Sequence, residues 1–261
     1  MTSFETYRDL YRLDGRVALV AGGAGGIGRA ICEGLAAFGA TVVVCGRTGA
    51  KCEALAAEIK SAGGQAWGAE LDILDIEGVR QFVSEVVDRL GRIDVLVNCV
   101  GTHKETPAEE YVEEDWDRVL DVNLKAAFFL SQAIARVQIP RGGGKHIHIS
   151  SVRSLLGLRR GYISYCSSKG GMNLMIKQLA TEWAKYNITV NGIAPTFTRT
   201  DLVRQYLEDP DFYNPLVARI PLGRVCEPVE LAAMAIYLAA PASDFITGQI
   251  IFADGGLTAT Q

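Results

Sequence analysis

The stretch VALVAGGAGGIGRA, from Val17 to Ala30, decides the fold. Apolar residues typical of a buried strand run directly into a turn with five glycines, and a helix-like pattern follows. Glycine loses much conformational entropy on folding, but it permits positive φ and close approach of a ligand to the backbone. A strand, a glycine turn and a helix in this order predict a βα unit whose N–H groups face a phosphate.

The glycines of this turn can be read in two registers. Gly23, Gly25 and Gly28 spell GxGxxG. Gly22, Gly26 and Gly28 spell GxxxGxG. Both registers put a phosphate at the turn, so motifs elsewhere in the chain have to decide between them.

Short β-branched runs alternate with helix-length segments along the whole chain. Between them lie amphipathic stretches, and in the one over residues 76–90 the apolar residues recur at helical spacing. Strands that are apolar on both faces and separated by helices indicate a parallel sheet covered on both sides. We therefore expect an α/β fold, one Rossmann-type doubly wound sheet of about seven strands, in a single domain over residues 1–261. The strand-like runs are RVALVAG, ATVVVCG, QAWGAELD, IDVLVNCVG, KHIHISS, NITVNGIAP and GQIIFADGG.

Composition excludes several classes of protein. The formal net charge is −4 and no block of Lys or Arg stands out, which argues against nucleic acid or a membrane surface as the partner. The six cysteines form no metal-binding spacing, so we expect small buried hydrophobes in a reducing compartment. The polar first residues and the absence of a long apolar run predict a cytoplasmic location.

A second set of motifs lies downstream of the glycine turn. Tyr165 and Lys169 form YxxxK, Ser151 precedes them by 14 residues, Asn123 stands in VNL, and the fourth strand ends in the segment 98–101. With these residues the chain resembles the short-chain dehydrogenase/reductase family from GRVALVAGGAGGIG nearly to its end at ADGG. The resemblance favours the GxxxGxG register and implies an N-terminal part that mainly binds the dinucleotide and a C-terminal part that mainly binds the substrate.

The resemblance assigns catalytic roles to four residues. It implies Tyr165 as general acid/base, Ser151 as the stabiliser of the substrate oxygen, Lys169 as a ribose contact that lowers the pKa of the phenol, and Asn123 as the holder of a proton-relay water. The spacing fits this chemistry, because residues at i and i+4 share a helix face and a nearby ammonium favours a phenolate. Tyr162 is a rival base without a lysine four residues later, and Ser150 is a rival for Ser151.

The coenzyme is expected to be NADP rather than NAD. In the family an acidic residue at the end of the second strand binds the ribose of NAD, whereas here VVVCGR places Arg47 there. An arginine pairs with a 2′-phosphate, although it can also stack over adenine. Asp72 is either an adenine contact or a turn residue. The resemblance implies coenzyme contacts from Gly22, Gly26, Ile27, Gly28, Arg47, Asp72, Ile73, Asn98, Gly101, Tyr165, Lys169, Pro195, Thr198 and Thr200.

The chain departs from the family pattern at several places. Ala21 replaces a threonine, the segment 98–101 reads NCVG, and Pro195 is followed by Thr196 where the family has glycine. The spacing from Ser151 to Tyr165 is one residue longer than the commonest form. The last two departures bear on the substrate side of the site.

Cationic residues gather in the segments that line the substrate pocket of the family. They suggest an anionic hydroxyl substrate such as a sugar acid or a sulfonated sugar, unless they are solvated or lie at subunit contacts. Two C-terminal segments are similar to the gluconate 5-dehydrogenase-like branch, which points the same way. The candidates are His103, Lys104, Arg153, Arg159, Arg160 and Arg199.

The expected function is NAD(P)-dependent hydride transfer that interconverts a secondary alcohol and a ketone or lactone. The alternative is a non-catalytic nucleotide-sensing or interaction protein on the same fold. No metal is expected, because His146 and His148 alternate on one strand face without a carboxylate at ligand spacing. The resemblance also implies a homotetramer, with one interface made by the helices over 115–137 and 165–185.

Overall fold

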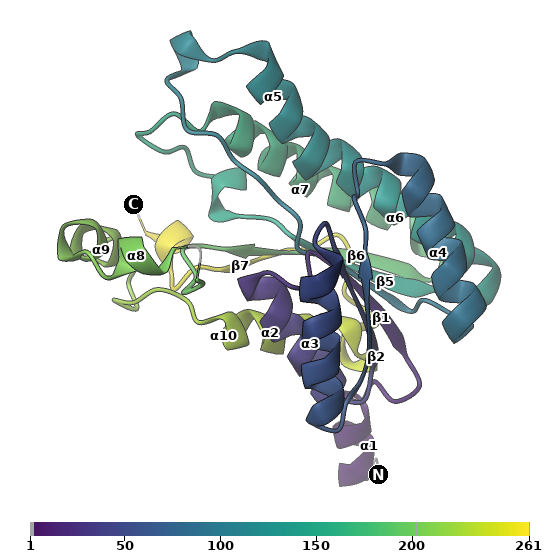
Figure 1. The fold of residues 1–261 in the computed structure, drawn as a ribbon. Helices are drawn as coiled ribbons and strands as arrows, with labels where there is room; N and C mark the ends of the chain where they lie inside the picture. The colour runs from purple at the N-terminus through teal and green to yellow at the C-terminus, as the bar shows by residue number, and fades with distance from the viewer. Residues whose placement is uncertain (1–2, 202, 261) are drawn as a thin grey trace.

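Seven parallel strands form one sheet in the computed structural model, which describes residues 3–201 and 203–260 (Figure 1). The strand order is β3-β2-β1-β4-β5-β6-β7, so the predicted doubly wound sheet is confirmed. The strand order reverses between the neighbouring strands β1 and β4, because β2 and β3 lie on one side of this point and β5 to β7 on the other. The strands are β1 (Val17–Ala21), β2 (Thr41–Gly46), β3 (Gln65–Glu70), β4 (Val95–Asn98), β5 (Gly144–Ile149), β6 (Ile188–Pro195) and β7 (Ile250–Ala253).

Helices cover both faces of the sheet (Figure 1). One face carries α2 (Gly26–Ala37), α3 (Gly49–Ser61) and α10 (Pro228–Ala239). The other carries α4 (Ile76–Leu90), α6 (Ala126–Gln138) and α7 (Ile163–Trp183). The remaining helices are α1 (Phe4–Asp9), α5 (Glu113–Leu120), α8 (Arg204–Leu207) and α9 (Pro210–Val217).

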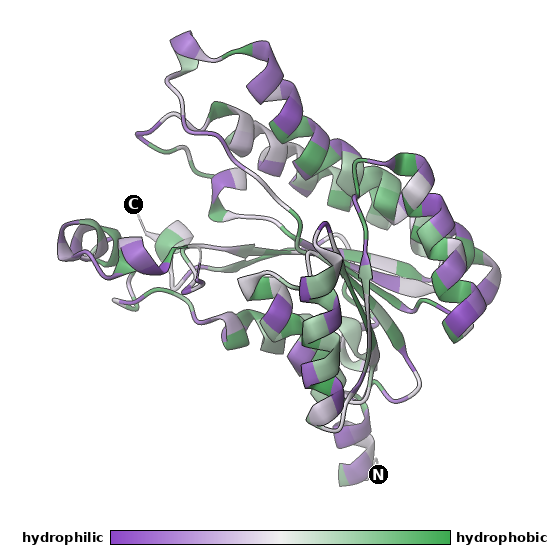
Figure 2. Ribbon diagram, in the orientation of Figure 1, coloured by the Kyte–Doolittle hydropathy of each residue, from purple (hydrophilic) through white to green (hydrophobic). Residues whose placement is uncertain are grey.

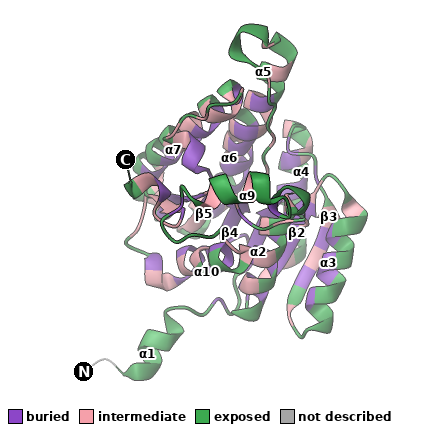
Figure 3. Ribbon diagram, turned by 90° about the vertical axis from the view of Figure 1, so that its left-hand side faces the viewer, coloured by how far each residue is buried: buried purple, intermediate pink, exposed green. Residues whose placement is uncertain are grey.

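The strand patterns explain the two apolar layers. Each residue of β1 is buried, and Ala18 and Val20 pack toward α2 while Val17 and Leu19 pack toward α4 and α6. Side chains alternate across a strand, so a run that is apolar throughout needs helices on both sides. The apolar residues of the helices accordingly face the sheet, and the central strands are buried (Figures 2 and 3).

The helix boundaries follow local signals. Asp75 caps α4, since its side chain accepts a 3.0 Å hydrogen bond from the N–H of Gly78. The helix ends at Gly91, whose φ of 78° lies in the left-handed region. The predicted helix over 115–137 consists of α5, a π-helical turn at Asp121–Lys125 and α6.

The two histidines of β5 are packed inside the protein. His146 Nε2 lies 2.9 Å from Gln138 Oε1, and His148 Nε2 lies 3.3 Å from Ser131 Oγ. Burial lowers the pKa of His146 to about 3 and the pKa of His148 to about 4. Both are therefore neutral packing residues at neutral pH. Within the described residues, no helix is both long and apolar enough to cross a membrane.

Candidate active site

The glycine turn connects β1 to α2 beside the carboxyl end of β4. Gly22 has a φ of 73°, and a Cβ on it would lie 3.1 Å from the backbone of Cys99. A Cβ on Gly28 would lie 2.2 Å from the Gly22 oxygen, and one on Gly26 would lie 2.6 Å from Thr200 Cβ. A Cβ on Gly25 would come no closer than 3.3 Å to its nearest neighbour, the Gly22 oxygen. The positions of GxxxGxG are thus the ones that sterics restrict most consistently.

Gly23 is restricted for a different reason. Its Cβ would lie 2.9 Å from the Val20 oxygen and 3.0 Å from Cys32 Sγ, which are core atoms. We interpret Gly23 as a packing glycine between β1 and α2. Ile27, one residue into α2, is half-buried against the same core.

Arg47 lies next to the glycine turn. It follows β2, whose last residue, Gly46, would place a Cβ 3.9 Å from the Cα of Gly22. Arg47 is exposed, and no ion pair among the described residues involves it. Its guanidinium is therefore available to an anionic group bound at the turn.

Asp72 follows β3 and is exposed. Its Oδ1 accepts a 3.0 Å hydrogen bond from the N–H of Leu74, which is the turn role left open by the sequence. Ile73, which lies between Asp72 and Leu74 in the sequence, is buried. An adenine contact by this segment stays a prediction.

The carboxyl end of β4 meets α7 and the π-helical turn. Asn98 Oδ1 accepts from the N–H of Val100 at 3.1 Å, while its Nδ2 is buried without a partner among the described residues. A Cβ on Gly101 would lie 3.6 Å from both Asn123 Oδ1 and Lys169 Nζ. This segment therefore lies between the glycine turn and the side chains of Asn123 and Lys169.

Asn123 lies in the π-helical turn and is fully buried. Its Oδ1 accepts from the N–H of Thr102 at 2.8 Å, and its Nδ2 donates to the Thr102 oxygen and to Ser168 Oγ, both at 2.9 Å. The side chain thus connects the loop after β4 to α7. π-Helical turns within helices occur frequently at functional sites.

Ser151 and Ser150 point in different directions. Ser151 is close enough to the phenol to lower the pKa of Tyr165, and its Oγ accepts from the N–H of Arg153 at 3.1 Å. Ser150 Oγ instead donates to Asn173 Oδ1 at 2.6 Å. The structure places Ser151 beside the phenol, as the resemblance implies.

The contacts of Tyr162 do not fit the role of a general base. Its hydroxyl donates to Glu105 Oε2 at 3.0 Å, and its ring stacks on His103 with centroids 5.4 Å apart. Burial, followed by the carboxylate of Glu105, raises the pKa of Tyr162. His103 also lies edge-on to Tyr165 at 6.2 Å, so this candidate substrate residue is at the site.

Lys169 is fully buried on α7. Its Nζ donates to the Ile149 oxygen at 2.7 Å and lies 5.8 Å from the ring centre of Tyr165. Burial lowers the pKa of Lys169 to about 8. The lysine therefore joins α7 to the end of β5, one helical turn after the tyrosine.

The prediction that Lys169 lowers the pKa of Tyr165 is wrong as far as the groups of the protein itself are concerned, because this pKa is raised. Burial raises this pKa more than the hydrogen bond from Ser151 and the charge of Arg153 lower it, and Lys169 is not among the groups that lower it. Desolvation of a phenolate outweighs a positive charge when that charge is itself directed to a backbone carbonyl.

The structure separates the cationic candidates into two groups. Lys104 pairs with Asp115 at 3.1 Å, and Arg160 and Arg199 each pair with a glutamate. Arg159 is exposed. These residues are therefore surface groups rather than neighbours of the phenol. The two glutamate pairs are Arg160 with Glu105, at 2.6 Å, and Arg199 with Glu227, at 2.9 Å.

Arg153 is the cation that reaches the phenol. It is buried, its Nη1 donates to the Gly157 oxygen at 2.9 Å, and its charge lowers the pKa of Tyr165. Arg219, at the end of α9, is close enough that its charge lowers the pKa of Arg153, although burial contributes more. Arg219 is not among the residues predicted from the sequence, because no local motif connects it to this site.

The loop after β6 closes the site from the other side. Pro195 ends β6, and Thr198 is buried with its Oγ1 donating to the Thr196 oxygen at 3.2 Å. Thr200 packs against Gly26 at the glycine turn. The hydroxyl of Thr196, where the family has glycine, is buried without a partner in the described chain.

Known proteins match this sequence and fold over nearly the full chain. A family model described as enoyl-(acyl carrier protein) reductase matches residues 22–258. The chain belongs to the short-chain dehydrogenase/reductase family. It is an oxidoreductase that acts on CH–OH groups with NAD(P) as coenzyme.

Several relatives of this oxidoreductase carry informative names. Gluconate 5-dehydrogenase of Gluconobacter oxydans (strain 621H) is 36% identical over 253 residues, with 97% of this chain and 98% of that protein covered. A tropinone reductase homolog of Arabidopsis thaliana is 39% identical over 249 residues, with 95% and 94% covered. A structure of a gluconate 5-dehydrogenase from Burkholderia cenocepacia J2315 in complex with NADP and tartrate has a TM-score of 0.93 and 40% identity, with 97% and 99% covered.

The residues of the enzyme fit a dinucleotide. The glycines at 22, 26 and 28 leave no space for a Cβ. The orphaned polar atoms Asn98 Nδ2 and Thr196 Oγ1 lie at the carboxyl ends of β4 and β6, on the same side of the sheet as the glycine turn. Buried polar atoms normally have partners, so unsatisfied ones at a ligand crevice indicate a polar ligand. In open α/β sheets that crevice lies at the carboxyl ends of the strands where the order reverses.

Proposed function

We propose that this enzyme interconverts a hydroxyl group and a ketone on a sugar acid, with NADP as the preferred coenzyme. The observation that carries the proposal is Arg153, a buried guanidinium beside Tyr165 that contacts a carbonyl and, in the described chain, no carboxylate. A buried charge needs a partner, and a carboxylate substrate supplies one with charge-assisted hydrogen bonds.

The chemistry assigned to the side chains is proton transfer at the substrate oxygen. In the direction of oxidation, the Tyr165 oxygen takes the hydroxyl proton while Ser151 holds the oxygen in place. Bound oxidised coenzyme supplies a hydride acceptor and a positive charge. Lys169 contributes a donor between α7 and β5, and Asn123 keeps the loop after β4 against α7.

The NADP preference rests on Arg47 beside the glycine turn. Its exposed guanidinium has no carboxylate partner among the described residues, and it stands where a ribose-binding acid would repel a 2′-phosphate. The related structure from Burkholderia cenocepacia contains NADP, which supports this proposal.

The decisive experiment is a substrate panel with both coenzymes. We expect NADPH-dependent reduction of 5-keto-gluconate and NADP-dependent oxidation of gluconate, with kcat/KM well above the values for neutral polyols. Tropinone belongs in the panel because a tropinone reductase homolog is 39% identical to this chain, against 36% for the gluconate 5-dehydrogenase of Gluconobacter oxydans. A better rate with tropinone or a neutral polyol, or no turnover of gluconate and 5-keto-gluconate, would reject the sugar-acid proposal.

We further propose a cytoplasmic homotetramer. Two long helical segments, α5 with α6 and α7, offer one interface, and the edge strand β7, which is half-buried, offers another. The six cysteines form no disulfide, which suits a reducing compartment. Light scattering that returns the mass of one 28.1 kDa chain would reject the tetramer.

A further inference from the structure

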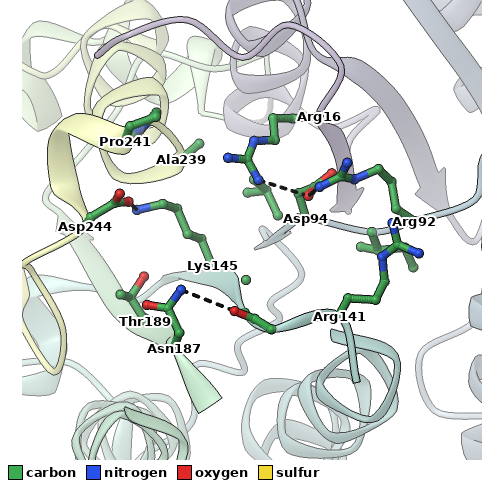
Figure 4. A pocket seen from close by; sticks show the side chains of 15 residues that line it. Arg16, Arg92, Asp94, Arg141, Lys145, Asn187, Thr189, Ala239, Pro241 and Asp244 are labelled. Atoms are coloured by element: carbon green, nitrogen blue, oxygen red, sulfur yellow. Dashed lines mark hydrogen bonds and ion pairs between the residues drawn. The ribbon is translucent and has the colours of Figure 1, made fainter. Parts of the chain in front are cut away.

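A polar pocket lies at the amino-terminal end of the parallel strands, whereas the glycine turn lies at their carboxyl end. Figure 4 shows this pocket. It is lined by residues at the amino ends of four central strands, from Arg16 before β1 to Thr189 in β6. The hollow measures about 150 Å³, and a water needs only about 10–15 Å³ of such space. The pocket therefore has room for more than one water.

Positive charges outnumber negative ones around this pocket. Four cations, Arg16, Arg92, Arg141 and Lys145, line it together with two carboxylates. Such a surplus is unusual in a chain whose net charge is −4. Like charges that converge on one hollow repel each other unless an anion lies between them.

The two carboxylates are already engaged. Asp94 accepts hydrogen bonds from Arg16 at 3.2 Å, from Arg92, and from the N–H of Val17 at 2.8 Å. Asp244 pairs with Lys145 at 2.8 Å. These contacts appear at the two sides of the pocket in Figure 4.

Some donors at the pocket have no partner. No ion pair in the described chain involves Arg141, which is exposed at the mouth. Arg92 Nε and Thr189 Oγ1 are buried without any hydrogen bond to the described residues, and Thr189 is only 9% exposed. The positive charge of Arg16 contributes to a lowered pKa of Lys145, for which burial is the main cause.

We propose that this pocket binds a compact dianion of the phosphate-monoester class, held by Arg141, Lys145 and Thr189. A phosphate group carries close to two negative charges at neutral pH, which matches the surplus of two cations. Its three oxygens accept from guanidinium, ammonium and hydroxyl donors in different directions, whereas a carboxylate is planar. The source is either free phosphate or a phosphorylated metabolite.

The site is distinct from the coenzyme site. The glycine turn follows the carboxyl end of β1, and this pocket precedes the amino ends of β1, β4, β5 and β6. Saturating NADP therefore blocks phosphate binding at the turn without filling this pocket.

Calorimetric titration of the NADP-saturated enzyme with inorganic phosphate tests the proposal. We expect one site per chain with a Kd of about 1 mM or tighter. Arg141→Gln should raise this Kd about tenfold or more, because a hydrogen bond to a charged group is lost. Thr189→Val, which keeps the shape of the side chain and the strand, should raise it as well, and Arg118→Gln on the exposed face of α5 should not.

Two further titrants identify the occupant. A sugar phosphate that binds at least tenfold tighter than inorganic phosphate indicates a phosphorylated metabolite, and equal binding indicates free phosphate. Acetate that binds as tightly as phosphate would contradict a dianion site. The proposal is overturned if phosphate does not bind, or if Arg141→Gln and Thr189→Val bind it as the wild type does.

Discussion

The Nζ atom of Lys169 donates a 2.7 Å hydrogen bond to the carbonyl oxygen of Ile149, the last residue of β5. The contact joins α7 to the strand that leads into Ser151. It also holds a lysine in a fully buried place, where the charged form is disfavoured.

Lys169→Met should change how stability depends on pH. The pKa of Lys169 is lowered to about 8 in the folded protein, from 10.5, so the folded state binds fewer protons than the unfolded state between these values. Wild-type stability should therefore gain about 2 kcal/mol between pH 7 and pH 9.5 that the variant lacks. Urea unfolding at both pH values measures this, with Lys177→Met, an exposed position on α7, as the control. Equal pH dependence in wild type and Lys169→Met would contradict the buried lysine.

Tyr165→Phe should lower kcat by about 10²–10⁴-fold while coenzyme binding is retained. The substitution removes only the hydroxyl that Ser151 contacts. Tyr162→Phe is the matched control, because its hydroxyl is bound to Glu105, and it should keep most of the activity. Turnover retained in Tyr165→Phe, or lost in Tyr162→Phe, would exchange the roles of the two tyrosines. Steady-state rates and a coenzyme fluorescence titration supply both readouts.

Arg47→Asp should shift coenzyme preference toward NAD. The change removes a partner for the 2′-phosphate and adds repulsion, so Kd for NADP should rise about tenfold or more while Kd for NAD changes little. Arg29→Asp, in α2 where Arg29 is paired with Glu33 at 2.9 Å, is a control with the same charge change. A wild type that already prefers NAD would show that Arg47 serves another purpose.

Arg153→Met should discriminate between charged and neutral substrates. If Arg153 holds a carboxylate, kcat/KM for gluconate should fall by an amount equivalent to about 2–5 kcal/mol, and kcat/KM for a neutral polyol of the same length should change little. Arg160→Gln is the control, because Arg160 is exposed and paired with Glu105. Parallel losses for both substrates would assign Arg153 to the shape of the loop through its bond to Gly157.

His148→Leu should make the protein more resistant to acid. Burial lowers the pKa of His148 to about 4 from 6.5, so the unfolded state takes up a proton that the folded state does not as the pH falls below 6.5. At pH 5 this lowers wild-type stability by about 2 kcal/mol, which the variant should recover relative to pH 7. Ser131 stays satisfied in the variant through its 2.8 Å bond to the Ala127 oxygen. Unfolding curves at pH 7 and pH 5 with unchanged differences would refute the buried neutral histidine.

Local patterns were sufficient to predict the fold and the helix that carries Tyr165 and Lys169. The run from Val17 to Ala21 is apolar on both faces, and the glycines that follow suit a phosphate, so a βα unit follows from a single stretch. Tyr165 and Lys169 share a helix face because of their spacing alone. These properties depend on residues within one or two turns of each other.

Other properties were decided only by tertiary structure. Arg160 and Arg153 look alike in the sequence, but one meets Glu105 at the surface and the other is buried beside the phenol. The direction of the pKa of Tyr165 depends on the desolvation by all atoms packed around it, which no spacing records. The pocket between Arg141 and Thr189 likewise brings together strands that the chain order separates. Ion pairing, burial and cavity shape are sums over neighbours distant in sequence, so they exist only once the chain has folded.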